Sequence, residues 1–178
     1  MLHLNFLPFP QLTTNSLVLR QLIAADADAI SVLRSNATVN QYLDRPKTTT
    51  PAEAIVFIDK ITTAINNNQS LYWVIASKES NQLMGTICMW NIVAEENTAE
   101  IGYELHPDFH GKGIMQEAIK AVIDFGFNVM QLRVITAFII AENVASIKSL
   151  ERSGFEPDVS GKYARQSDEG YLIYVRQK

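Results

Sequence analysis

Two carboxylates and a pair of glycines lie close together in the middle of the chain, between residues 100 and 115. Glu100 and Glu104 share one face of an alternating segment, so both can reach one cavity and accept a proton from a nucleophile. Gly111 and Gly113 follow, just before apolar residues at helical spacing. Open backbone amides at the start of a helix are typical of a phosphate or pyrophosphate site. An ordinary tight turn is the competing interpretation.

The glycine pair matches neither of the two common nucleotide-binding loops. Lys112 is followed by Gly113, whereas a Walker loop requires Ser or Thr after the lysine. The third glycine of the dinucleotide fingerprint is also absent from this segment. The segment is therefore neither a Walker loop nor a dinucleotide-binding loop.

The segment resembles motif A of the GNAT acetyltransferase superfamily, which is usually written Gln/Arg-x-x-Gly-x-Gly/Ala. Here the motif runs from His110 to Met115, and these two end residues depart from the family pattern. The resemblance implies that the segment holds the pyrophosphate of acetyl-CoA. Neither departure removes a backbone N–H donor, so the implied cofactor site stands.

A second motif lies one helix and one strand further on. Asn143, Ser146 and the pair Gly154-Phe155 are similar to the Asn-x-x-Ser…Gly-Phe signature of the RimJ/RimL-type branch, which acetylates protein N-termini. Helix capping alone is the competing interpretation for Asn143 and Ser146. The two motifs together imply acetyl-CoA as co-substrate, with cofactor-binding residues Leu105, His106, His110, Gly111, Lys112, Gly113, Ile114, Met115, Asn143 and Ser146.

Acyl transfer from a thioester to an amine needs a proton acceptor, an oxyanion donor and a donor to the departing thiolate. Glu100 or Glu104 is expected to take the proton, directly or through water, and Asp168 or Glu169 is a weaker alternative. The resemblance implies the backbone N–H of Leu105 for the oxyanion and Ser146 for the thiolate, where other branches use a tyrosine. The expected catalytic residues are Glu100, Glu104 and Ser146.

The remaining pattern predicts the elements that position these residues. Strands are expected over residues 16–22, 70–76, 82–93, 98–105, 132–140, 155–163 and 171–176. Helices are expected over residues 26–33, 36–42 and 51–65, after Gly113, and from Asn143 to Gly154. The strand–helix–strand order across residues 98–140 predicts a parallel pair, with a ligand at the carboxyl ends of its strands.

The fold class is α/β (α+β). The resemblance implies a GNAT-like mixed, mostly antiparallel central sheet of about six or seven strands, with helices on both faces. It also implies a splayed parallel strand pair at the cofactor site. The length predicts a single domain over residues 1–178, with residues 1–15 as an irregular arm. In the family, the loop that contains residues 42–46 forms part of the acceptor site, whereas simple packing is the competing interpretation.

Composition narrows the classes of partner. The formal net charge of −4 argues against a nucleic-acid-binding protein. The single cysteine, Cys88, excludes an internal disulfide and a cysteine metal cluster, and no metal is expected. No apolar run could span a bilayer, and residues 1–8 lack the features of a secretion signal, so a cytoplasmic protein is expected. It is expected to be a monomer or homodimer.

The leading hypothesis is an acetyl-CoA-dependent N-acetyltransferase that acts on a protein or peptide N-terminal α-amine by direct attack in a ternary complex. An enzyme for a small amine (a polyamine, aminoglycoside or amino acid) is the alternative within the same class. A CoA-binding sensor without turnover and a nucleotide-phosphate binder of another fold remain as further alternatives.

Overall fold

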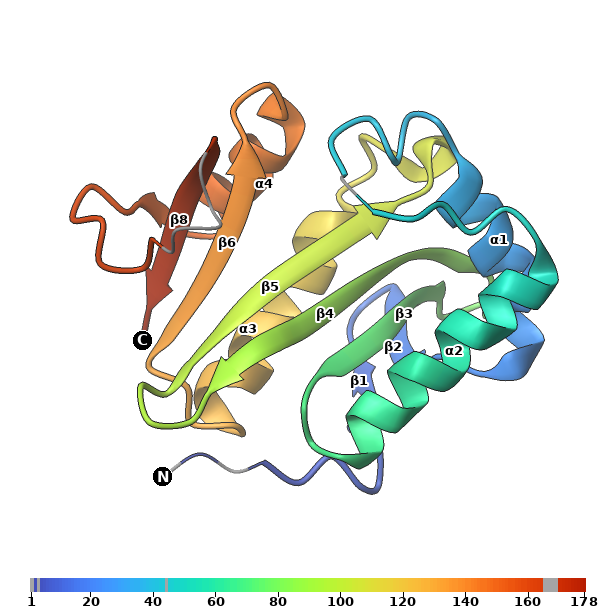
Figure 1. Ribbon diagram of the computed structural model, residues 1–178, viewed down its shortest axis with the longest axis horizontal. Coiled ribbons are helices and arrows are strands. Elements are labelled where there is room, and N and C mark those ends of the chain that lie inside the picture. The colour runs from blue at the N-terminus through green and yellow to red at the C-terminus, as the bar shows by residue number, and fades with distance from the viewer. Residues whose placement is uncertain (1, 3, 44, 165–169) are drawn as a thin grey trace.

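The computed structural model describes residues 2, 4–43, 45–164 and 170–178. Within that part of the chain, the strands form an eight-stranded sheet in the order β1-β2-β3-β4-β5-β6-β8-β7 (Figure 1). Neighbouring strands are antiparallel, apart from the parallel pair β5–β6. The sheet has one strand more than the seven expected, because β1, a pair of residues at its edge, lies in the segment predicted to be an irregular arm.

The strands are β1 (Leu12–Thr13), β2 (Leu17–Gln21), β3 (Leu71–Ser77), β4 (Leu83–Val93), β5 (Thr98–Leu105), β6 (Val134–Ile140), β7 (Glu156–Pro157) and β8 (Tyr171–Gln177). The helices are α1 (Ala27–Ser35), α2 (Pro51–Asn66), α3 (Ile114–Asn128) and α4 (Val144–Arg152), with short 3₁₀ helices η1 (Ala24–Asp26) and η2 (Pro107–Phe109).

Local sequence signals explain where two of the helices begin. The side chain of Thr50 accepts a hydrogen bond from the N–H of Glu53 at 3.2 Å, and the Glu53 carboxylate accepts one from the N–H of Thr50 at 3.1 Å. This capping box, followed by Pro51, starts α2 as the sequence predicts. The Asn143 side chain caps α4 by accepting a hydrogen bond from the N–H of Ser146 at 3.2 Å.

The helices cover both faces of the sheet. Tyr72 and Trp73 are neighbours on β3, so their side chains point to opposite faces. Tyr72 packs edge-on against Phe57 of α2 at 5.6 Å between ring centroids, and Trp73 packs against Phe125 of α3 at 5.7 Å. In Figure 1, α2 accordingly lies on one side of the central strands and α3 on the other.

The parallel pair opens along its length. β5 and β6 are paired only at Thr98–Val134, Ala99–Ile135 and Glu100–Thr136 within the part of the chain described. Beyond Glu100, β5 stays paired with β4 as far as Leu105, and β6 stays paired with β8. The splayed pair that the resemblance implied is therefore present, and Figure 1 shows the two strands diverging towards their carboxyl ends.

Two predicted elements are wrong. Residues 36–42 form turns and no helix. The N–H of Asn40 reaches the carbonyl of Asn36 at 3.1 Å, as in a helix, but those of Gln41 and Leu43 bond only three residues back, at 3.4 and 3.2 Å, as in turns. The strand expected over residues 155–163 is limited to β7, since the carboxylate of Asp158 accepts hydrogen bonds from backbone N–H groups that follow it and turns the chain.

Candidate active site

Two cavities meet where β5 and β6 separate. The first, of about 500 Å³, lies between the start of α3, α4 and the end of β5. The second, of about 370 Å³, lies between β5, β6 and the first residue of β8. Groups bound in the two cavities can come together along their shared wall, which consists of Tyr42, Leu43, Tyr103, Asn143 and Ser146.

The first cavity ends at the two glycines of the predicted phosphate loop. Gly111 and Gly113 have φ angles of 72° and 77°, and a Cβ added to either would meet no heavy atom within 4 Å among the described residues. The first intrahelical bond of α3 runs from the N–H of Glu117 to the carbonyl of Gly113 at 3.0 Å. The amides of residues 114–116 therefore lie ahead of the hydrogen-bonded part of α3 and suit an anion such as a pyrophosphate.

His110 connects this loop to the end of β5. Its ring Nε2 lies 2.9 Å from the carbonyl oxygen of Leu105, so Nε2 carries the proton in that contact. The N–H of His106 bonds across to Met84 of β4 at 2.8 Å. Because successive residues of a strand direct their N–H groups to opposite edges, the N–H of Leu105 points to the open edge of β5. This is the orientation that an oxyanion donor in the opening requires.

The expected cofactor residues divide into two groups. His106 and Lys112 are directed elsewhere: the His106 ring lies beside Asp108 and Phe109, and Lys112 Nζ donates to the carbonyl of Asp108 at 2.8 Å. Met115 contacts the core and also lines the first cavity. The expected residues that line the first cavity are Leu105, His110, Gly111, Gly113, Ile114, Met115, Asn143 and Ser146.

Tyr103 is a site residue that the sequence reasoning missed. Its hydroxyl lies 2.7 Å from the hydroxyl of Ser146, and both residues line both cavities. Burial raises the pKa of Tyr103 to about 12, so the phenol is protonated and can donate near neutral pH. In the sequence, the alternation of β5 indicates only that Tyr103 lies on the face opposite Glu104. The contact of Tyr103 with α4 depends on the fold and could not be predicted from that spacing.

The two candidate carboxylates are separated by the structure. Both are buried, but Glu100 lines the second cavity and Glu104 lines the first. Glu100 accepts a hydrogen bond from Asn91 Nδ2 at 2.8 Å. Glu104 accepts one from the Thr86 hydroxyl at 3.1 Å and forms an ion pair with Arg45. The weaker candidates, residues 168 and 169, lie outside the described residues.

Cys88 has no visible part in this arrangement. Burial raises the pKa of its thiol to about 12, so the thiol is protonated near neutral pH, as expected of a packed cysteine. Among the residues described, no cluster of three or more His, Cys, Asp or Glu side chains could hold a metal ion. No helix in the described ranges is long and apolar enough to cross a membrane.

Comparison with known sequences gives a consistent result. Residues 16–156 match the family model described as an acetyltransferase (GNAT) domain. The chain is 31% identical over 164 residues to the uncharacterized N-acetyltransferase YoaA of Bacillus subtilis, covering 92% of this chain and 93% of the relative. It is 34% identical over 148 residues to the uncharacterized N-acetyltransferase p20 of Bacillus licheniformis, covering 83% of each. It is also 25% identical to the spermidine N(1)-acetyltransferase of Escherichia coli, covering 80% of this chain and 74% of that protein.

Solved structures share the fold. A putative ribosomal-protein-serine acetyltransferase from Vibrio cholerae superposes with a TM-score of 0.83 at 20% identity, covering 96% of this chain and 99% of that one. The Microcin C7 self-immunity acetyltransferase MccE, solved in complex with acetyl-CoA and AMP, superposes with a TM-score of 0.79 at 22% identity, covering 93% and 94% of the two chains.

Proposed function

The chain belongs to the GNAT acetyltransferase family, and from that premise we propose that it acetylates a single primary amine, namely the N-terminal α-amine of a protein or peptide. The observation that carries the proposal is the meeting of the two cavities at the Tyr103–Ser146 pair. One cavity then takes the acetyl donor and the other takes the amine. Acetyl-CoA, when bound, supplies the acetyl group as a reactive thioester.

The first cavity has the donors that the diphosphate of CoA requires. Backbone amides at the start of α3 face it, and Gly111 and Gly113 place no side chain over them. Arg152 of α4 lines the same cavity and adds a cation. We therefore assign the donor to the first cavity, with the phosphates at residues 111–116.

The residues around the opening can divide the chemistry of acyl transfer among them. Glu100 lines the second cavity and accepts the proton of the attacking amine, directly or through water. The N–H of Leu105 points to the open edge of β5 and donates to the carbonyl oxygen on which charge develops. Tyr103 passes its phenol proton to Ser146, and the Ser146 hydroxyl protonates the departing thiolate.

The lining of the second cavity favours an acceptor with one amine and an apolar body. Glu100 is the one acidic residue among the described residues that line it, and Arg45 is the one cation. A polyamine carries several cationic nitrogens, and each of them needs a carboxylate or another acceptor when it leaves water. Much of the remaining lining is aromatic or aliphatic: Leu43, Trp90, Ile101, Phe138, Ile139, Ile140 and Tyr171. This composition suits the first residues of a peptide chain.

The similarity to proteins named for ribosomal-protein and spermidine acetylation makes both acceptors worth testing side by side. The full chain is incubated with acetyl-CoA and one acceptor at a time, and thiol release is followed. The acceptors are an apolar peptide with a free N-terminus, the same peptide with a blocked N-terminus and an internal lysine, and spermidine. The free peptide is expected to give a kcat/KM at least tenfold above the other two.

A higher kcat/KM with spermidine would transfer the proposal to a small-amine acetyltransferase. CoA binding without acceptor-dependent thiol release would favour a sensor. Protection against heating by ATP and none by CoA would indicate a nucleotide-binding protein and would contradict the assignment of the first cavity.

A further inference from the structure

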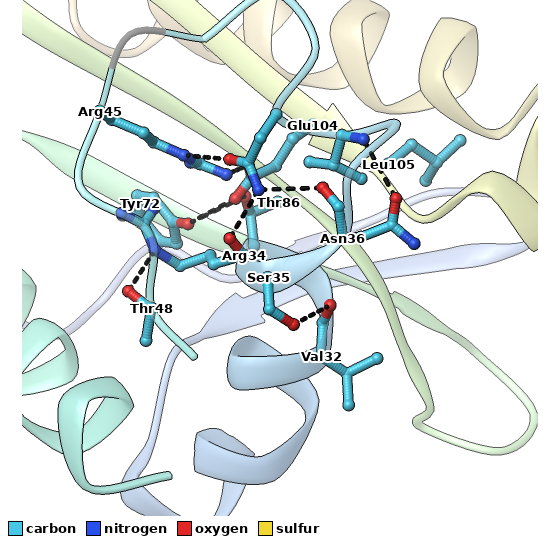
Figure 2. A network of polar contacts seen from close by, with 12 residues as sticks. Val32, Arg34, Ser35, Asn36, Arg45, Thr48, Tyr72, Thr86, Glu104 and Leu105 are labelled. Carbon is cyan, nitrogen blue, oxygen red and sulfur yellow. Dashed lines mark hydrogen bonds and ion pairs between the residues drawn. The ribbon is translucent and has the colours of Figure 1, made fainter. Parts of the chain in front are cut away.

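Glu104 lies at the centre of a buried polar network (Figure 2). One of its carboxylate oxygens accepts a hydrogen bond from the Thr86 hydroxyl at 3.1 Å and another from the Tyr72 hydroxyl at 3.5 Å. Its second oxygen forms the ion pair with Arg45, and Figure 2 shows the two side chains pointing towards each other. Both oxygens of Glu104 therefore have protein partners.

Arg45 belongs to the α1–α2 loop, defined here as residues 36–43 and 45–50. Its Nε donates to the side-chain oxygen of Asn40 at 3.1 Å, and Asn40 in turn donates to the carbonyl of Arg34 at 2.7 Å. Through these contacts one carboxylate on β5 is linked to both ends of the turns over residues 36–43. Thr38, Val39, Gln41, Tyr42 and Leu43 of the same turns line the first cavity.

A second arginine makes the charge of Glu104 more important. Arg34 is buried, donates to Thr48 at 3.0 Å and lies over the ring of Phe57 at 3.9 Å from its centroid. Burial lowers the pKa of Arg34, and the nearby charge of Arg45 lowers it further, whereas Glu104 opposes the effect. Without the Glu104 charge, the repulsion between Arg34 and Arg45 would no longer be offset by this carboxylate, and Arg45, which is the less buried of the two, would be the group to leave.

We infer that Glu104 is a positioning residue: through Arg45 it holds the α1–α2 loop against β5, and it thereby fixes Tyr42 and Leu43 as the wall shared by both cavities. The proton of the amine is then taken by Glu100 and not by Glu104. The inference rests on the proposed function in one respect, namely that the second cavity binds the acceptor amine. The attachment of the loop can be measured without any acceptor.

Limited proteolysis tests the attachment directly. Lys47 is exposed and lies in the α1–α2 loop, so trypsin can cleave after it once the loop leaves β5, whereas Arg45 precedes a proline and resists cleavage. The full chain and the variants Glu104→Gln and Arg45→Met are treated with trypsin, and cleavage after Lys47 is timed by mass spectrometry. Both variants are expected to be cleaved about tenfold faster than the wild type, the size expected when a coupled buried pair is broken. Arg45→Lys keeps the charge and is expected to restore slow cleavage.

Arg20→Met is the matched control. Arg20 and Asp26 form an ion pair of similar burial, with side chains 15% and 8% exposed against 20% and 6% for Arg45 and Glu104. Arg20 lines neither cavity. The control is expected to leave both the cleavage after Lys47 and the acetyl-transfer kinetics unchanged.

Kinetics then separate positioning from proton transfer. Glu104→Gln and Arg45→Met are each expected to raise the acceptor KM about tenfold, with kcat within about threefold of the wild-type value. Because both substitutions break the same contact, the KM of the double variant should be no higher than that of the poorer single variant. The pH profile of kcat/KM should keep its shape in Glu104→Gln and lose its acidic limb in Glu100→Gln.

Two results would overturn the inference. The first is unchanged cleavage after Lys47 in Arg45→Met, a variant that remains informative even if Glu104→Gln does not fold. The second is a fall in kcat of more than a hundredfold in Glu104→Gln alone, with KM unchanged, which would make Glu104 the proton acceptor. Failure of the wild type to acetylate any amine would instead contradict the proposed function and leave the proteolysis result valid.

Discussion

Replacing Gly113 by alanine tests the phosphate loop more directly than any other change. Gly113 precedes α3 with a φ angle of 77°, a conformation that costs an L-residue roughly 1–2 kcal/mol. Alanine recovers about 0.4–1 kcal/mol by restricting the unfolded chain, so the net loss of stability is about 1 kcal/mol. Among the described residues, no heavy atom lies within 4 Å of the added Cβ, so their packing contributes nothing further. The melting temperature should fall by about 2–4 °C.

The effect on CoA should be larger than the effect on folding. The added methyl group would stand over the amides that face the first cavity and would keep a phosphate from reaching them. One hydrogen bond to a charged group contributes about 1.5–3 kcal/mol, which corresponds to a dissociation constant about 10- to 150-fold weaker. At a CoA concentration of about 100 times the wild-type Kd, stabilisation of about 2.7 kcal/mol would fall to about 1.4 kcal/mol or less.

Gly161→Ala is the control for this experiment. Gly161 has a φ angle of 67°, an added Cβ would likewise meet no heavy atom of the described residues within 4 Å, and it is not among the residues that line the two cavities. It should show the same loss of melting temperature with unchanged CoA affinity in titration calorimetry. If Gly113→Ala binds CoA as tightly as Gly161→Ala does, the diphosphate does not sit on this turn and the assignment of the first cavity is refuted.

Three further outcomes are expected. Tyr103→Phe removes the 2.7 Å contact with Ser146 and should lower kcat about tenfold at unchanged KM for acetyl-CoA. Because the pKa of Tyr103 is raised to about 12, deprotonation of this phenol should not reduce the wild-type rate between pH 6 and 9. Burial raises the pKa of Glu117, but hydrogen bonds from Ser16 and its neighbours lower it more, so the net shift of the pKa is downward. Glu117→Gln should therefore reduce the free energy of unfolding by about 1 kcal/mol at pH 7, and urea titrations should show this difference vanish as the pH falls through the lowered pKa. Gly85→Ala should lower the melting temperature by roughly 5 °C or more, because its Cβ would overlap the main chain of β5, which cannot move without breaking the sheet.

Local signals were sufficient for several elements whose cause is local. The helix over residues 51–65 and the helix from Asn143 to Gly154 were predicted from residue types and spacing, and the structure has both, with caps at Thr50 and Asn143 and a left-handed Gly154. The predicted helix over residues 36–42 is wrong although it starts with one helical bond, from the N–H of Asn40 to the carbonyl of Asn36; the bonds that follow reach only three residues back. Residue spacing does not distinguish such a series of turns from a short helix.

The arrangement of the site was predicted less completely, because it depends on contacts between distant residues. Period-two spacing placed Glu100 and Glu104 on one face, but their partners come from different segments: Asn91 of β4 for one, and Arg45 of the α1–α2 loop for the other. Nothing in the spacing of β5 separates their roles. The contact between Tyr103 and Ser146 spans 43 positions in sequence and exists only because α4 returns beside the opening of the sheet.

The short pairing of β5 with β6 has a mechanical consequence. Among the described residues, backbone bonding between the strands β1–β5 and the strands β6–β8 is confined to residues 98–100 of β5 and to Asn97 just before it. Separation of these two halves therefore breaks far fewer bonds than separation at β3–β4 or β4–β5, and partial unfolding should begin along this line. The backbone amides of Tyr103 and Leu105, which point to the open edge of β5, should exchange with deuterium sooner than those in the middle of β3, and a molecule that spans both halves should slow that exchange.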